Sequence, residues 1–313
     1  MLSLMRYNMS AKNGEIKYTV SMFKKYRNLL GELTRKNVKL KYRNSWLGIL
    51  WSFIQPLLYM VVLSVVFGGI FGTERKDIVC FPVYLFTGRL LFSFFTTSTK
   101  QAMTSFRRNQ AIIKKVYVPK YMYPLSSILS NFINFAISLL CLIFVWIFFK
   151  TTGIAGGGAL HINGYVLLCW VPMLILLIFC TGVGLILSVI SVYFRDIEYI
   201  WEVLCQLLFY MVPIIYHLNR IIKSHPPINY VVNIGGKPLM LFNHPIIIED
   251  HPMVMIIKLN PLYSMIELFR QCVLYHQIMS TSMLLYAAVF SFITLFVGIW
   301  FFNKKSDDII FHL

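Results

Sequence analysis

Blocks of about 20 apolar residues recur along this sequence, and they restrict its fold more than any other feature. A helical block of that length crosses a hydrocarbon core about 30 Å thick. Lipid offers no hydrogen-bond partners, so a single block must satisfy its own backbone groups by forming a helix. The composition agrees, because 58% of the 313 residues are hydrophobic and only 13% are charged, roughly half the charged share of a soluble domain. We therefore predict an all-α integral membrane protein.

The apolar blocks divide the chain into a simple order. We count six predicted spans, over residues 47–72, 82–104, 122–149, 165–192, 199–217 and 281–302. They form one membrane domain over residues 46–302. An N-terminal tail (1–18) and an amphipathic segment (19–45) precede it, and a short tail (303–313) follows it. In the fourth span, Gly182 and Gly184 predict a close approach to another helix.

Most of the positive charge lies beside the spans, although a net charge of +17 by itself would suggest a nucleic-acid partner. Eleven of the 29 Lys and Arg precede Trp46, and five more separate the second and third spans: Arg107, Arg108, Lys114, Lys115 and Lys120. Lys and Arg concentrate on the cytoplasmic side of membrane proteins. Both segments are therefore predicted to be cytoplasmic, and an even number of spans returns the C-terminus to the same side. We expect these charges to face membrane lipid and the cytoplasm, and we expect no nucleic acid as a partner.

The segment before the first span has a helical apolar face. Its apolar and aromatic residues are spaced three, four, three and seven apart, at Phe23, Tyr26, Leu30, Leu33 and Leu40. Basic residues occupy much of the remaining surface, which is typical of a helix lying in the membrane interface. A helix packed against a protein partner has the same pattern, and both interpretations stay open.

The segment between the fifth and sixth spans, residues 218–280, is long and is predicted to lie outside. It mixes proline and glycine turn signals with apolar runs that are too short to cross a bilayer. Such runs predict short re-entrant or exterior helices. One of them covers 261–275, with Glu267 and Arg270 inside an apolar pattern.

Catalytic signatures are missing from the sequence, which contains no H-E-x-x-H, no G-x-S-x-G and no P-loop. We therefore predict a transporter and not an enzyme, driven either by another chain or by ions. Ion coupling usually needs intramembrane acids, and Glu202 is the acid that keeps this alternative open. A cluster from His244 to His251, with Glu249 and Asp250 between, has metal-ligand chemistry but no helical ligand spacing, so a solvated surface is favoured over a metal site or the active site of a membrane enzyme.

Several polar residues lie within or beside the predicted spans. Arg89 in the second span either sits near the outer boundary or faces a polar conduit, where it would pair with an anionic substrate. Pro56 frees a backbone carbonyl one turn earlier, which must be satisfied by a neighbouring helix or by water. Gln55 is then expected to face a path between subunits, and Trp46 to mark the point where the first span enters the bilayer.

The loop between the second and third spans has a partly apolar centre. Gln110 to Val118 predict a short helix before Pro119, with Ile112 and Ile113 on one side. This helix is either a docking surface or a positively charged anchor, and the residues alone favour neither.

Four stretches in this order resemble one family: KYRNSWLGILWSFIQP (41–56), NQAIIKKVYVP (109–119), YFRDI (193–197) and NPLYSMIELFR (260–270). Together they resemble the permease subunit of ABC-2-type polysaccharide exporters, which move O-antigens, teichoic acids and capsule-like polymers. The resemblance covers residues 20–302 and departs from the family pattern near 223–253, where about 30 residues look inserted.

The resemblance implies a homodimer in the bacterial cytoplasmic membrane, with a channel for a lipid-linked glycan between the two subunits. Two copies of a cytoplasmic ABC ATPase would bind ATP and Mg, and this chain would bind no cofactor. Carried over to this sequence, the ATPase-coupling residues are Ile112, Ile113, Lys114, Lys115, Tyr117, Pro119, Arg195 and Asp196. The substrate entrance and path are expected at Arg35, Lys39, Lys41, Arg43, Trp46, Gln55 and Arg89. An exporter of a small amphiphile or drug with the same fold is the alternative.

Overall fold

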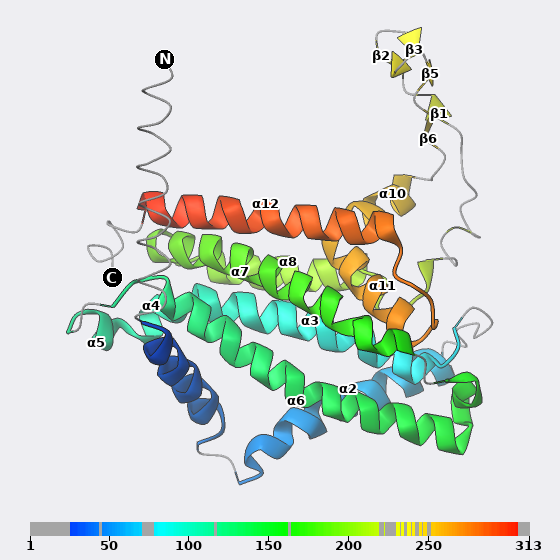
Figure 1. Cartoon of the computed structure of the whole chain (residues 1–313), viewed down its shortest axis with the longest axis horizontal. Helices are drawn as coiled ribbons and strands as arrows, with labels where there is room; N and C mark the ends of the chain where they lie inside the picture. The colour runs from blue at the N-terminus through cyan, green and yellow to red at the C-terminus, as the bar shows by residue number, and fades with distance from the viewer. Residues whose placement is uncertain are drawn as a thin grey trace.

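A computed structural model describes most of the chain, and its helices lie alongside one another in one bundle (Figure 1). The described residues are 26–43, 46–70, 78–115, 118–161, 164–218, 222, 230–231, 233–234, 237–238, 240–241, 244–245, 247–248 and 252–305. Three predicted parts lie outside these residues: the N-terminal tail with the amphipathic segment before Tyr26, Tyr117, and the C-terminal tail after residue 305. The predictions made for them stay predictions.

Each predicted span has a helix in the corresponding place. The helices are α2 (Trp51–Leu63, after the 3-10 turn η1, Gly48–Leu50, and continuing as the π-helix η2, Ser64–Ile70), α3 (Phe81–Met103), α6 (Met122–Thr152), α7 (Trp170–Tyr193, after η5, Gly164–Cys169), α8 (Ile197–Met211) and α12 (Thr281–Lys305). In the described part of the chain, three helical stretches are long and apolar enough to cross a membrane: Met122–Thr152, Gly164–Tyr193 and Thr281–Lys305.

Local backbone chemistry explains where two of these helices end. The prediction for the fifth span was wrong at its C-terminal end, because α8 stops at Met211 and not at 217. Val212 precedes Pro213 and is extended (φ −82°, ψ 130°), since proline disfavours a helical residue before it. Helix α6 ends at Gly153, whose left-handed φ of 67° lets its N–H bond to the Phe149 carbonyl.

Close backbone contact joins α7 to α12. A Cβ atom added at Gly182 would lie 2.6 Å from the Leu295 N atom, and one added at Gly298 would lie 2.6 Å from the Gly182 carbonyl oxygen. Only glycine allows this approach, as Gly182 predicted. Gly184 contacts side chains instead: its added Cβ would lie 2.9 Å from Ala102 Cβ.

The N-terminal helix over residues 26–42 lies at one end of the bundle, beside α4 (Ser105–Arg108) and the start of α6 (Figure 1). Leu30 and Leu33 are buried in a cluster that includes Phe106 and Tyr123. Leu40, on the same predicted apolar face, is 49% exposed, so the described part of the chain leaves open whether lipid or a partner covers it. In the second half of this helix a polar contact reaches α6: the Asn37 Nδ2 atom donates to Ser126 Oγ at 3.3 Å.

The other end of the bundle carries α10 (Pro252–Leu259) and α11 (Pro261–Val273), which covers the helix predicted over 261–275 (Figure 1). The Asn260 side chain caps α11 by accepting the Leu262 N–H at 3.0 Å. Ten of its thirteen residues are buried.

Residues 230–248 add strands that the all-helical prediction did not include. Three antiparallel pairs of two-residue strands, β1–β6, β2–β3 and β4–β5, lie apart from the helical bundle (Figure 1). Their bounds are Tyr230–Val231, Asn233–Ile234, Lys237–Pro238, Met240–Leu241, His244–Pro245 and Ile247–Ile248. The side chains of the predicted His244–His251 cluster lie outside the described residues. In the part that the structure describes, no group of three or more His, Cys, Asp or Glu is placed to hold a metal ion.

We expect Gly182→Ala to lower the unfolding temperature of the purified protein, because the added methyl group collides with the backbone of α12. Overpacking of this kind costs about 1–3 kcal/mol. Gly31→Ala is the control, since nothing lies within 4 Å of its added Cβ and alanine favours a helix. Equal melting temperatures for Gly182→Ala and the unmodified protein, measured in the same detergent, would contradict the close contact.

Candidate functional site

Helix α3 is buried except along one polar stripe. Seventeen of its 23 residues are buried, and the six others are all polar: Arg89, Ser93, Thr96, Thr97, Lys100 and Gln101. Their spacing of four, three, one, three and one places them on one face of the helix. We call this set the α3 stripe. A polar face of this kind, left uncovered on a membrane helix, is unsuited to lipid.

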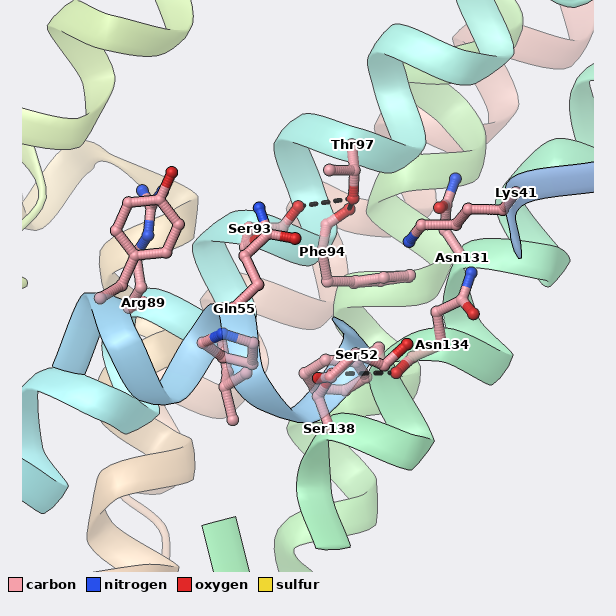
Figure 2. Close-up of a pocket in the computed structure, with 14 residues that line it drawn as sticks. Lys41, Ser52, Gln55, Arg89, Ser93, Phe94, Thr97, Asn131, Asn134 and Ser138 are labelled. Atoms are coloured by element: carbon pink, nitrogen blue, oxygen red, sulfur yellow. Dashed lines mark hydrogen bonds between the residues drawn. The ribbon is translucent and has the colours of Figure 1, made fainter. Parts of the chain in front are cut away.

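Helices α2 and α6 extend the α3 stripe into a polar groove (Figure 2). Ser52 and Gln55 from α2 face Asn131, Asn134 and Ser138 from α6 across this groove, and Lys41 stands at one end of it and Arg89 at the other (Figure 2). Its volume is about 120 Å³. The residues that line it are Lys41, Ser52, Gln55, Pro56, Tyr59, Arg89, Leu90, Ser93, Phe94, Thr97, Asn131, Asn134, Phe135 and Ser138.

The backbone carbonyl that Pro56 leaves free in α2 has a hydrogen-bond partner in α6. Proline has no N–H, so the carbonyl of Ser52, one turn earlier, loses its helical hydrogen bond. The Ser138 Oγ atom lies 3.2 Å from the Ser52 carbonyl oxygen and 3.0 Å from the Asn134 carbonyl of its own helix. Of the two expected partners, a neighbouring helix or water, the structure provides the neighbouring helix.

A second polar contact joins the N-terminal helix to the same groove. The Tyr42 hydroxyl hydrogen-bonds to the Ser52 hydroxyl and donates to the Asn134 Oδ1 atom at 3.2 Å. The Asn131 amide donates to Gln101 Oε1 at 3.0 Å. The N-terminal helix, α2, α3 and α6 are therefore held in register by hydroxyl and amide groups.

Helix α8 forms a second wall beside the α3 stripe. Between them lies a recess of about 420 Å³, which Arg89 and Thr97 share with the polar groove. The Arg89 guanidinium lies 4.7 Å from the centre of the Tyr59 ring on α2 and 5.3 Å from that of Phe209 on α8. Arg89 therefore stands where the two hollows meet.

Polar contacts hold the first turns of α8, none of whose residues is buried. Lys100 Nζ lies 3.1 Å from Glu202 Oε1, and the Trp201 Nε1 atom donates to Thr99 Oγ1 at 3.1 Å. Arg107 forms an ion pair with Glu198. Glu202 is thus occupied by a lysine, which weakens the alternative of an ion-driven pump.

At the opposite end of α8 a buried arginine holds the chain. Arg270 of α11 is wholly buried and donates to the carbonyls of Pro213 at 2.8 Å and Tyr84 at 3.2 Å. Glu267 lies 3.7 Å from it. His276 lies nearby, and its Nε2 atom accepts the His161 backbone N–H at 3.2 Å. Partial burial lowers the pKa of His276, and the positive charges of His161 and Lys150 lower it further.

The loop after α3 forms two separate helical turns, α4 and α5 (Gln110–Ile113). The prediction of one helix from Gln110 to Val118 was wrong in its length. Asn109 breaks the preceding turn with φ −111° and ψ 13°, and its Nδ2 atom donates to the Ser105 carbonyl at 2.9 Å, as asparagine side chains do when they compete with helical bonds. Lys114 and Lys115 follow α5 as exposed residues.

The structure brings some of the predicted site residues together and leaves others apart. Lys41, Gln55 and Arg89 line one groove. The other entrance residues, Arg35, Lys39, Arg43 and Trp46, are exposed and do not line it. Arg195 and Asp196 are exposed in the turn between α7 and α8.

Sequence reasoning missed most of the groove. Ser93 and Thr97 on α3, and Asn131, Asn134 and Ser138 on α6, have spacings of three and four that place each set on one helical face. Polar residues with that period inside an apolar block are a readable signal. The role of Arg270 had no such signal, because its partners are backbone carbonyls of distant residues.

Comparison with known proteins gives one family. A family model described as ABC-2 type transporter matches residues 28–233. The chain is 27% identical over 283 residues to the O-antigen export system permease protein RfbA of Myxococcus xanthus, covering 90% of this chain and 94% of the relative. It is 29% identical to the protein of that name in Klebsiella pneumoniae, covering 88% and 91%. It is 23% identical to the polysialic acid transport protein KpsM of Escherichia coli, covering 87% and 91%.

We expect Ser138→Ala to destabilise the protein by about 1 kcal/mol, because the Ser52 carbonyl loses its donor. In a Pro56→Ala background the same change is expected to cost less, since residue 56 then supplies an N–H to that carbonyl. Thermal unfolding of the four proteins of this cycle measures the coupling. An equal loss of stability in both backgrounds would mean that Ser138 does not compensate the carbonyl that Pro56 leaves free.

Proposed function

Since this chain belongs to the ABC-2 type transporter family, we propose that it is the permease subunit of an ATP-driven exporter for a lipid-linked polysaccharide. The relatives named above for O-antigen and polysialic acid handle polysaccharides, which supports this substrate class. We place the subunit in the bacterial cytoplasmic membrane, with six crossings and both termini in the cytoplasm.

The α3 stripe is the observation that carries the proposal. In a single chain two of its six polar residues, Thr97 and Lys100, are exposed and the other four are half-buried, on a helix whose other residues are buried. In our proposal a second copy of the chain covers this stripe and turns it into one wall of a polar channel. The homodimer then keeps lipid away from groups that lipid cannot hydrogen-bond.

The size of the groove supports a path between two subunits and not through one. Its volume of about 120 Å³ is well below the roughly 300–1,000 Å³ of usual small-molecule sites. A polysaccharide strand therefore needs additional space. A channel between two copies supplies that space without opening the bundle.

Amide and hydroxyl groups beside aromatic rings suit a sliding glycan. Asn131, Asn134 and Gln55 offer hydrogen-bond donors and acceptors, and Tyr59 and Phe209 offer ring faces. Each such contact is worth on the order of 1 kcal/mol, which is weak enough to exchange during movement. We assign the cytoplasmic entrance for the phosphate end to Arg35, Lys39, Lys41 and Arg43, with Trp46 at the membrane surface.

Coupling to the ATPase is proposed at the end of the bundle that carries α4, α5 and the N-terminal helix (Figure 1). Lys36 Nζ lies 3.5 Å from Asn109 Oδ1, which ties the N-terminal helix to this loop. The Arg107–Glu198 ion pair continues the connection to α8. ATP and Mg bind to two partner ATPase subunits, whose movement reaches the channel wall through these contacts. The contacting residues are Ile112, Ile113, Lys114, Lys115, Tyr117, Pro119, Arg195 and Asp196.

We expect Ser93→Leu combined with Thr97→Leu to reduce polysaccharide at the cell surface several-fold, because these changes make the channel wall apolar. Thr294→Leu on α12 is the matched control, since its hydroxyl also bonds to the carbonyl four residues earlier. Surface polymer would be measured in cells whose own gene is replaced, with protein amounts compared by immunoblot. Full export by the double variant would sink the channel assignment.

We expect Lys114→Glu with Lys115→Glu to weaken copurification of the ATPase about tenfold, because charge reversal in an interface replaces attraction with repulsion. The matched control reverses Lys304 and Lys305, two exposed lysines at the same end of the bundle. Unchanged ATPase stoichiometry and ATP turnover in the first variant would contradict the coupling assignment.

A further inference from the structure

Arg89 carries a charge deep within the helical bundle. It lies eight residues after the start of α3 and fourteen before its end, which is about 12 Å and 21 Å along the helix axis. A charged side chain at such a depth in a membrane is costly, and it persists where it faces a cavity and serves a function.

Two aromatic rings flank the Arg89 guanidinium. The ring centres of Tyr59 and Phe209 lie within 5.3 Å of it, on α2 and α8. Cation–π contact stabilises the charge through the ring faces. A guanidinium has five N–H donors, so these contacts leave donors available to a ligand.

No carboxylate among the described residues lies within ion-pair distance of Arg89. Glu202 of α8 lines the same recess as Arg89 but pairs with Lys100, which is eleven residues further along α3, about 16 Å away along its axis. Arg270 makes the contrast clear, because it is wholly buried and bonds to the Pro213 and Tyr84 carbonyls and to Glu267. Both terminal nitrogens of Arg270 donate to backbone carbonyls, whereas the contacts of Arg89 with the described residues are with two aromatic rings.

The surroundings of Arg89 suit an anion that carries an apolar tail. Arg89 lines both the polar groove and the 420 Å³ recess beside α8, a volume within the usual range of small-molecule sites. Tyr59 and Tyr210, at the edges of these hollows, are 45% and 69% exposed. A head group can therefore enter from the bundle surface while its tail stays in lipid.

From this geometry we propose that Arg89 is a binding subsite for the phosphate group of the lipid-linked substrate. The planar guanidinium offers two parallel N–H groups to two phosphate oxygens, a pairing that lysine cannot reproduce. The phosphate would come from the substrate carrier and not from a membrane phospholipid. The inference rests on the proposed export function and deepens it, because it gives the substrate a second anion contact beyond the basic entrance.

The test uses the purified permease–ATPase complex in dodecyl maltoside, a detergent without phosphate. Undecaprenyl pyrophosphate is the probe, uncharged undecaprenol is the control lipid, and phosphatidylglycerol represents the bilayer. Lipid retained per complex is measured by native mass spectrometry over a concentration series. We expect the pyrophosphate to bind at least about tenfold more tightly than undecaprenol, as charge-assisted hydrogen bonds require.

Two variants separate charge from geometry. Arg89→Gln should lose most of the preference for the pyrophosphate, and Arg89→Lys, which keeps the charge but loses the fork, should bind it more weakly than the unmodified protein. Lys150→Gln, a charge change on another helix, should have no effect. Equal retention by Arg89→Gln and the unmodified complex would overturn the proposal. An Arg89-dependent affinity for phosphatidylglycerol that matches that for the pyrophosphate would overturn the substrate assignment.

A failure of this inference is distinguishable from a failure of the export function. Surface polysaccharide that depends on the gene, together with pyrophosphate binding that ignores Arg89, would refute the subsite alone. Loss of ATPase copurification and gene-independent surface polymer would refute the export function itself.

Discussion

A hydrocarbon core supplies no hydrogen-bond partners, and the arrangement of polar groups in this bundle depends on that constraint. Most hydroxyl groups on the helices bond to carbonyls of the preceding turn, as Thr97 does to Ser93 at 2.6 Å. Groups that cannot do so are joined between helices, as in the contact of Ser138 with the Ser52 carbonyl. On the α3 stripe Thr97 and Lys100 are exposed although both have hydrogen-bond partners within the chain, so this face of the bundle is better suited to a polar partner than to lipid.

The two arginines of the bundle show how the same side chain serves two purposes. Arg270 is enclosed by carbonyl oxygens at the break after α8, so its charge holds α11 and the end of α8 together. Arg89 is enclosed by rings that stabilise the charge without using all its donors. Both guanidinium groups lie against aromatic rings, so the difference lies in the acceptors: Arg270 also donates to backbone carbonyls, and Arg89 keeps more of its N–H donors for an anion.

Helix α8 lies between these two arrangements and has no fully buried residue, although Trp201, Leu208 and Phe209 pack against the apolar core. Its first turns are held by ion pairs to α3 and α4, and its end by Arg270. Contacts between partly exposed charges are weak individually. Ring contacts of Phe209 with Phe92 and of Trp201 with Phe95 add to these polar contacts, and the proposed function would use α8 as a channel wall.

The sequence by itself determined the six apolar helices, the basic segments at one end of the bundle and the family, because apolar length, charge placement and motif order are properties of one chain segment at a time. The free carbonyl one turn before Pro56 could also be predicted, since the missing proline N–H depends only on the local sequence. The tertiary structure alone decided that Ser138 bonds to the carbonyl that Pro56 frees, that three helices combine into one polar groove, and that Arg270 bonds to distant carbonyls while Arg89 lies between two rings. Those outcomes depend on the rotation and register of helices against one another, which packing sets between residues far apart in the sequence.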